Sequence, residues 1–65
     1  MFIKLTDAYN NLSFYLNSVH ILSFRHNKEI NCTTIIVTTD TNYCYQVKES
    51  PEYLVNLIKG TYLNV

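Results

Sequence analysis

Ring-bearing and basic side chains are the residues of this sequence whose types best fit a ligand site. Arg25, His26 and Lys48 could donate charge-assisted hydrogen bonds to phosphate oxygens. Aromatic rings could stack on a planar ligand of the nucleotide type, because every base has a flat π-face. The rings that we assign to this role are Tyr15, Phe24, Tyr43 and Tyr45. Alternatively, the tyrosines line a contact between subunits. The ligand-binding role and the subunit-contact role can hold together, because ligand sites of small oligomers often lie between subunits.

The cysteines and histidines have the wrong spacing for a metal site. Zinc sites normally use close Cys-x-x-Cys or His-x3–5-His pairs, and neither Cys32 and Cys44 nor His20 and His26 follow such a pattern. We therefore expect free structural thiols and no bound metal.

No residue pattern indicates catalysis. A Cys-His pair is available, but no sequence signature accompanies it, and a domain this small offers little pocket to exclude water. A single glycine rules out a Gly-rich phosphate loop. The carboxylates are expected in turns or at a helix start, where they cap and close the backbone: Asp7, Glu29, Asp40, Glu49 and Glu52. We predict that the protein is not an enzyme and uses no cofactor.

Length and composition predict one domain, residues 1–65, that associates with copies of itself. A chain of 65 residues buries only about 60% of the surface that its unfolded form exposes. Hydrophobic residues nevertheless make up 48% of the chain, with six tyrosines and three phenylalanines. A surplus of apolar and aromatic surface belongs at an interface or in a binding groove. We expect a homo-oligomer.

Charge and hydropathy exclude two partner classes. Five Lys and Arg balance five Asp and Glu, whereas a dedicated DNA or RNA binder normally carries a basic surplus. No apolar run approaches the roughly 18 residues that cross a membrane. The first residues alternate in polarity and do not form a charged region followed by an apolar run, so we expect no secretory signal and a cytoplasmic protein with reduced thiols.

Hydrophobic patterning predicts an α+β fold, an antiparallel meander of about five strands followed by one C-terminal helix. Leu12, Phe14 and Leu16 are expected on one inner face. The third strand is apolar on both faces, which is typical of a strand covered on both sides, the second cover coming from another subunit. The expected strands are Phe2–Thr6, Leu12–Asn17, Val19–His26, Ile30–Thr39 and Tyr43–Val47, joined by turns at Asp7–Asn11, Asn27–Glu29 and Asp40–Asn42.

The clearest single element is a helix that begins after Ser50. Ser50 is a preferred N-cap and Pro51 suits the first helical position. The apolar stripe consists of Leu54, Leu57 and Ile58, and Gly60 is expected to close the helix in a left-handed conformation. The segment Thr61–Val65 is apolar enough to form an added edge strand or an arm onto a neighbour.

The order of the motifs "IKLT", "FYLN", "TTIIVTT" and "YQVKESPEYLVNLI" resembles the small FlbD-like (SwrD-like) proteins of bacterial flagellar operons. Members of that family begin with a strand ending in Leu-Thr, continue with Phe-x-Leu-Asn and close with a helix start of the form Val-x-Glu-Ser. The resemblance spans nearly the whole chain. It implies the fold above and a motility role through protein contacts, without catalytic residues.

In size, apolar content and lack of catalytic residues the chain also looks like the very small β-rich proteins with which viruses of bacteria sequester nucleotide immune signals. Our leading hypothesis is a phage-type binding module that captures such a signal between subunits. Its ligand-binding residues would be Tyr15, Arg25, His26, Tyr43, Tyr45 and Lys48. The alternative is a flagellar or swarming accessory protein of the FlbD-like kind.

Overall fold

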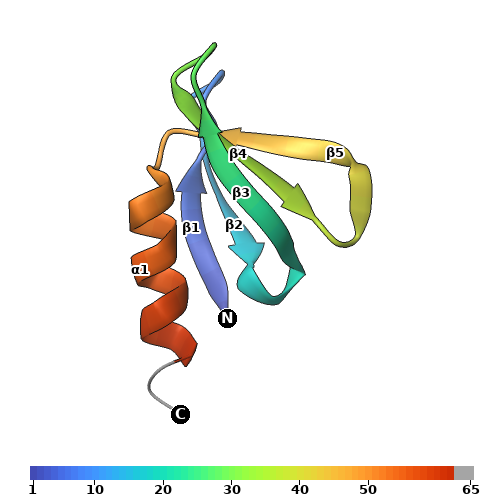
Figure 1. Ribbon diagram of the computed structural model, residues 1–65, viewed down its shortest axis with the longest axis vertical. Helices are drawn as coiled ribbons and strands as arrows, with labels where there is room; N and C mark the ends of the chain where they lie inside the picture. Colours follow the sequence, from blue (N-terminus) through green and yellow to red (C-terminus); the bar gives the residue numbers. More distant parts are fainter. Residues whose placement is uncertain (63–65) are drawn as a thin grey trace.

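A computed structural model describes residues 1–62 as five antiparallel strands followed by one helix (Figure 1). The α+β class, the five strands and the C-terminal helix are therefore confirmed. The strands are divided between two sheets, β1-β2 and β3-β4-β5, and do not form one continuous meander. The elements are β1 (Phe2–Thr6), β2 (Ser13–Asn17), the 3-10 helix η1 (Ser18–His20), β3 (Ile21–Asn27), β4 (Cys32–Val37), β5 (Asp40–Val47) and α1 (Pro51–Tyr62).

The first hairpin forms where the sequence predicts it. Ile3 pairs with Leu16 and Leu5 pairs with Phe14, so that these four side chains share the inner face. In the turn, the Asp7 carboxylate accepts hydrogen bonds from the following backbone amides, and Asn11 adopts a φ of 63°. Asn is one of the few residues that tolerates this left-handed region at low cost.

Strands β3, β4 and β5 form the second sheet. Phe24, Ile35 and Tyr45 lie in one row across the three strands, because β4 pairs with both of its neighbours in antiparallel register. The β4–β5 turn is Thr38–Thr39, and β5 already begins at Asp40. The expected hairpin turn at Asp40–Asn42 is therefore wrong, because these residues lie within β5. The pairing with β4 shifts register at this point: Ile36 pairs with Cys44, whereas Val37 pairs with Asp40. The Asp40 carboxylate accepts a hydrogen bond from Asn42 N–H at 3.1 Å inside this irregular stretch.

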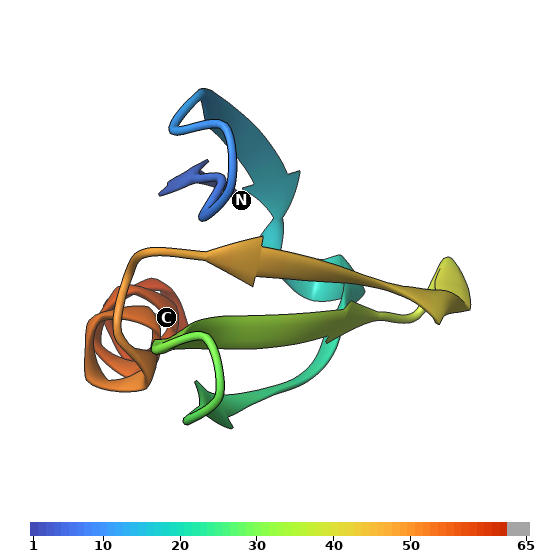
Figure 2. The same cartoon turned by 90° about the horizontal axis from the view of Figure 1, so that it is seen from above.

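A seam of backbone hydrogen bonds joins the two sheets between β1 and β5. Ala8 N–H donates to the Gln46 carbonyl at 2.8 Å, Lys48 N–H donates to the Thr6 carbonyl at 3.0 Å, and Asp7 and Val47 form a β-bridge. The resulting order of strands is β2-β1-β5-β4-β3, in which β1 lies beside β5. Figure 2 shows the hairpin β1–β2 on one side of β5, and β4 and β3 on the other.

The core lies between the two sheets and α1. Leu5, Ile35, Val47 and Leu54 have no exposed surface, and Ile3 and Val37 complete the buried cluster. Figures 1 and 2 place α1 and the β4–β5 turn on opposite sides of the molecule. The helix contributes its Leu54 side chain to the cluster and packs Leu57 against it, as the apolar stripe predicts.

The predicted start of α1 is correct and its predicted end is wrong. The Ser50 hydroxyl accepts a hydrogen bond from Tyr53 N–H at 3.1 Å, and the helix begins at Pro51. It continues through Gly60 to Tyr62, and Gly60 does not have a positive φ. A glycine costs a helix only about 0.5–1 kcal/mol, so it does not have to end one. Of the expected tail element, Thr61 and Tyr62 belong to the helix, and residues 63–65 lie outside the described part.

The segment Val19–His26 is not one strand. Asn17 accepts a hydrogen bond from Val19 N–H at 3.3 Å and caps η1, so β3 starts only at Ile21. Within the single chain β3 is not covered on both faces, because Leu22 is 58% exposed. Leu12 also departs from its expected inner position: it precedes β2 and is 66% exposed.

Among residues 1–62, no helix combines the length and apolar character that a membrane span requires.

Candidate functional site

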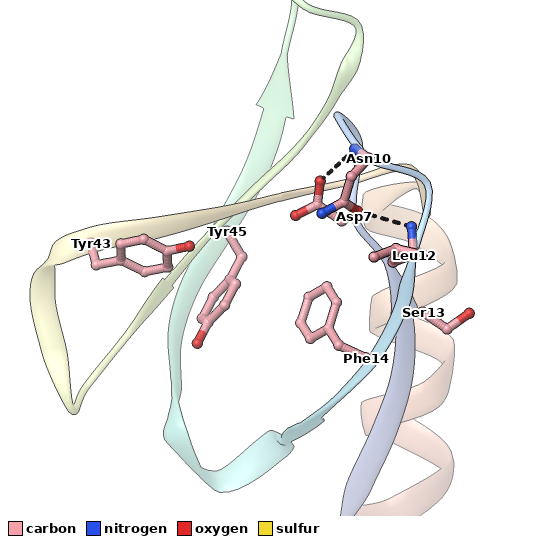
Figure 3. A pocket seen from close by; sticks show the side chains of 7 residues that line it. All are labelled: Asp7, Asn10, Leu12, Ser13, Phe14, Tyr43 and Tyr45. Atoms are coloured by element: carbon pink, nitrogen blue, oxygen red, sulfur yellow. Dashed lines mark hydrogen bonds between the residues drawn. The ribbon is translucent and has the colours of Figure 1, made fainter.

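Three aromatic rings from two strands form a continuous wall. Phe14 and Tyr45 are stacked, with ring centroids 5.3 Å apart and an interplanar angle of 25°. Tyr43 meets Tyr45 edge to face at 4.9 Å and 82°. Figure 3 shows Phe14 approaching from β2 and the two tyrosines from β5. In the edge-to-face pair of Tyr43 and Tyr45, the positive edge of one ring meets the negative face of the other. Stacked pairs such as Phe14 and Tyr45 are favourable when the two rings are offset.

Strand periodicity explains why these rings meet. Tyr43, Tyr45 and Val47 share one face of β5 because alternate residues of a strand point the same way. Phe14 points inward from β2 in the same register as Leu5. The seam between β1 and β5 then brings the inner face of the hairpin opposite the inner face of β5. Val47 is fully buried, whereas Tyr45 is half-buried and Tyr43 exposed, so the row runs from the core to the surface.

A pocket of about 410 Å³ lies against this wall. Its other side is the turn after β1, which contributes polar side chains and one apolar one (Figure 3). The volume lies within the ordinary range for small-ligand sites, about 300–1,000 Å³. The lining residues are Asp7, Asn10, Leu12, Ser13, Phe14, Tyr43 and Tyr45.

The polar side of the pocket is fixed by local hydrogen bonds. Asp7 Oδ1 accepts from the backbone amides of Tyr9 at 2.8 Å and Asn10 at 3.0 Å. Asn10 Oδ1 accepts from Leu12 N–H at 2.9 Å. Both side chains are thus held by the turn that they stabilise, which is the Asx-turn geometry that favours Asp and Asn here. Their orientation toward the pocket is set before any ligand arrives.

Lys48 lies close to the same turn. Its ammonium Nζ donates to Asn11 Oδ1 at 2.7 Å, linking the segment after β5 to the β1–β2 turn. Asn11 directly follows Asn10, which lines the polar side of the pocket. Of the three predicted phosphate-binding residues, Lys48 is therefore the one attached to the turn that lines the aromatic pocket.

Arg25 and His26 lie elsewhere. They line a second pocket of about 420 Å³ at the β3–β4 hairpin, with Asn27, Lys28 and Glu29. Arg25 is aligned with Thr34 and Gln46, one residue out of step with the Phe24, Ile35 and Tyr45 row. It therefore projects from the opposite face of the sheet. Within one chain, the structure does not bring Arg25 together with Tyr43 and Tyr45.

Tyr15 and Phe24 also lie apart from the wall. Tyr15 is paired with Lys4 and is 66% exposed on the outer face of the hairpin. Phe24 is half-buried and packs against the core. The sequence prediction missed one ring of the wall, Phe14, and the turn residues Asp7 and Asn10 on the other side of the pocket. The sequence pattern predicts Phe14 as a core residue and Asp7 as a turn residue, and only the β1–β5 seam reveals that they share a pocket.

The two cysteines are free and lie on the same outer face of the second sheet as Gln46. Cys32 is buried and Cys44 exposed. Burial raises the pKa of the Cys32 thiol above its ordinary value, because desolvation disfavours the thiolate. The Gln46 amide lies between the two sulfur atoms, 3.5 Å from Cys32 Sγ through its oxygen and 3.4 Å from Cys44 Sγ through its nitrogen. In residues 1–62, no three His, Cys, Asp or Glu side chains are placed to hold a metal ion.

Comparison with known proteins adds no relative to this geometry: no family model, no curated protein and no solved structure matches the chain.

Proposed function

We propose that this protein is a non-enzymatic, phage-type binding module that sequesters a small nucleotide immune signal at pockets completed between the subunits of a homo-oligomer in the cytoplasm. The observation that carries the proposal is the pocket of about 410 Å³ with its wall of Phe14, Tyr43 and Tyr45. Such a wall offers a flat ligand a large apolar contact, and stacking of a base on an aromatic side chain contributes about 1–3 kcal/mol.

The requirement for more than one subunit follows from where the basic groups lie. Arg25, His26 and Lys28 surround their own pocket, and Arg25 faces away from the aromatic wall. A ligand with both a ring and phosphates can touch both sets only if a second copy presents its basic hairpin to the first copy's aromatic pocket. Lys48, held at the turn beside that pocket, would supply one cation from the same chain.

Aromatic exposure supports association as well. None of the aromatic side chains that the structure describes is buried, and the most exposed include Phe2, Tyr9 and Tyr15. Exposed aromatic side chains in such numbers are more common at binding interfaces than on the rest of a protein surface.

Thermal shift against a panel of cyclic and linear nucleotides tests the proposal. A ligand present at 100 times its Kd stabilises the folded state by about 2.7 kcal/mol, which raises the Tm of a domain this small by roughly 10–20 °C. Tyr45→Ala is expected to abolish the shift. Tyr15→Ala, which removes an exposed ring from the outer face of the hairpin, is the matched control and should leave the shift intact. No stabilisation by any member of the panel would count against the proposal.

Light scattering tests the assembly. A homo-oligomer is expected at micromolar concentration, and a stable single copy in dilute solution would contradict the shared pocket.

A second candidate function is a FlbD-like motility accessory that acts through protein contacts. It is favoured by the apolar side chains left exposed around η1 and the start of β3, Val19 and Leu22, both 58% exposed. Capture of a flagellar protein that depends on Val19 and Leu22, together with a flagellar gene neighbourhood, would support this candidate. A phage neighbourhood would favour the first.

A further inference from the structure

We infer that a second copy of this chain pairs with the open edge of β2, antiparallel and about a twofold axis at Tyr15, so that two β1–β2 hairpins form one four-stranded unit. A homo-oligomer is part of the proposed function, but this edge would join the copies whether or not a nucleotide binds. Three properties of β2 favour the pairing: the direction of its backbone groups, its lack of charge and the apolar residues at its two ends.

Every second residue of β2 turns its backbone away from β1. Leu12 and Ser18, which flank β2, both bond to the β1 side: the Leu12 carbonyl accepts at 2.9 Å and Ser18 N–H donates at 2.8 Å. Hydrogen-bonded and non-hydrogen-bonded pairs alternate along an antiparallel ladder, so the residues that bond to β1 are the even-numbered ones. The outward residues are Ser13, Tyr15 and Asn17. Within residues 1–62, no ladder or loop bond reaches their outward N–H groups.

The two edges of the strand order β2-β1-β5-β4-β3 are not equally protected. The edge strand β3 carries the charged Arg25, and its pairing with β4 shifts register between Ile21 and Ser23. Charged side chains and bulges are the devices with which proteins guard an edge against other chains. The edge strand β2 has the sequence SFYLN, without charge or proline, and pairs with β1 without a register shift. It is therefore the edge that suits pairing with another chain.

The β2 edge is complementary to itself. Tyr15 is the middle residue of the strand, so antiparallel pairing over the full length places Tyr15 opposite Tyr15 of the second copy. Their outward N–H and carbonyl groups would bond to each other, and Asn17 N–H would donate to the Ser13 carbonyl of the second copy. Aromatic side chains directly opposite each other stabilise antiparallel pairs. The contact is closed, because each copy uses the same edge and none is left over.

Charge does not oppose this pairing. The charged residue beside Tyr15 on the outer face of the hairpin is Lys4. In the dimer the two Lys4 residues would be three strand spacings apart, about 14 Å. This separation exceeds the screening length of about 8 Å at physiological ionic strength. The formal net charge of the chain is zero, so long-range repulsion between copies is also weak.

The ends of β2 carry exposed apolar side chains that the dimer would cover. Leu12 precedes the strand and Val19 follows it, and they are 66% and 58% exposed. Antiparallel pairing brings the start of β2 in one copy beside the end of β2 in the other, so Leu12 would lie near η1 of the second copy. Leu12 also lines the aromatic pocket. The second copy would therefore form part of the rim of that pocket.

The same twofold axis directs the basic hairpin away from the pocket. Figure 1 shows the β1–β2 turn and the β3–β4 hairpin at the same end of the molecule. Antiparallel pairing places the β3–β4 hairpin of the second copy at the opposite end. A site that combines a basic hairpin with an aromatic pocket would then need a further pair of subunits.

Opposite charges at position 15 test the axis. Sedimentation equilibrium of the ligand-free chain is expected to show a dimer for the wild type and for Tyr15→Ala, which keeps the edge uncharged. Tyr15→Glu and Tyr15→Lys each place like charges opposite each other and should raise the dimer Kd by about 10- to 100-fold. An equimolar mixture of these two variants should restore association, because a position on the axis faces only itself, and this rescue also shows that both variants are folded. Tyr53→Glu, at an exposed position of α1, is the matched control and should leave the Kd unchanged.

A disulfide across the axis tests the register. Opposed residues of a hydrogen-bonded antiparallel pair have Cα atoms about 5.5 Å apart, which suits a disulfide. Exposed Cys44 is first replaced by serine. In this Cys44→Ser background, oxidation of Tyr15→Cys by dissolved oxygen should give a covalent dimer on a non-reducing gel. Phe2→Cys is the control: Phe2 is 67% exposed on the same face, but it lies on β1, too far from its counterpart to cross-link.

The outcomes separate the β2 pairing from the proposed function. A dimer whose Kd ignores charge at position 15, with no cross-link through Tyr15→Cys, overturns the pairing and leaves nucleotide binding unaffected. A chain that stays monomeric at every concentration measured overturns both the pairing and the shared pocket. A dimer with the expected charge response and cross-link, but without stabilisation by any nucleotide, supports the pairing and counts against the proposed function alone.

Discussion

Leu54 anchors α1 in the core, and its truncation should destabilise the protein by a large part of its total stability. The side chain is fully buried among Leu5, Ile35 and Val47. Leu54→Ala therefore loses its transfer free energy and leaves a cavity, which together cost about 2–5 kcal/mol. A domain of 65 residues has a total stability of about 3–10 kcal/mol at 0.05–0.15 kcal/mol per residue. The variant is expected to be marginally folded or unfolded at 37 °C.

Urea unfolding followed by far-UV circular dichroism measures this loss. Val55→Ala is the control on the same helix, because Val55 is 44% exposed and the change removes little contact with the core. We expect Val55→Ala to remain within about 0.5 kcal/mol of the wild type. If Leu54→Ala were equally mild, α1 would not be packed on the sheets in solution, and the assignment of the core would be refuted.

Four further predictions concern the turn, the cap and the two thiols. Asn11→Ala should destabilise the fold by about 1–2 kcal/mol because Asn11 has a positive φ, while Asn11→Gly should be close to neutral in the same urea experiment. Ser50→Ala should lower the free energy of unfolding by about 1 kcal/mol through loss of the N-cap, whereas Ser50→Asp should retain most of the stability. Equal destabilisation by Ser50→Ala and Ser50→Asp would contradict the capping role of Ser50. A thiol reagent at neutral pH should modify exposed Cys44 much faster than buried Cys32 in the native protein and both at similar rates in urea. Burial raises the pKa of the Cys32 thiol, so the contribution of this thiol to stability is complete below the ordinary thiol pKa and declines as the pH rises above it. The free energy of unfolding of Cys32→Ala should therefore fall less steeply at alkaline pH than that of the wild-type protein.

Local signals in the sequence predict the elements well where one physical rule dominates. The alternation of Ile3 and Leu5 defines β1, and the Ser50-Pro51 pair defines the start of α1, because in each case periodicity or capping has no competitor. The predictions fail where two rules compete. Val19 and Leu22 are apolar and favour a strand, but the Asn17 side chain caps η1 and delays β3.

The candidate site was only half accessible to sequence reasoning. Stacking chemistry predicts Tyr43 and Tyr45 as ring residues of the site, and their alternate positions in β5 place them on one face. Their partner Phe14 and the polar turn residues Asp7 and Asn10 are not predicted, because nothing local indicates that β1 pairs with β5. The prediction also combined Arg25 with the tyrosines, although β-strand parity places Phe24 and Arg25 on opposite faces of the sheet.

The β1–β5 seam has a consequence for biosynthesis. The first hairpin has no neighbouring strand until Gln46 and Lys48 have left the ribosome, and the Glu49 carboxylate that holds the amide and hydroxyl of Thr6, both at 2.9 Å, comes 43 positions later in the chain. Until then the inner side of the nascent hairpin, with Leu5 and Phe14, stays open to water and to other chains. A chain that stops before Gln46 is therefore expected to be a target for chaperones and proteases, whereas the chain that includes β5 and α1, with Leu54 in the core, should escape them.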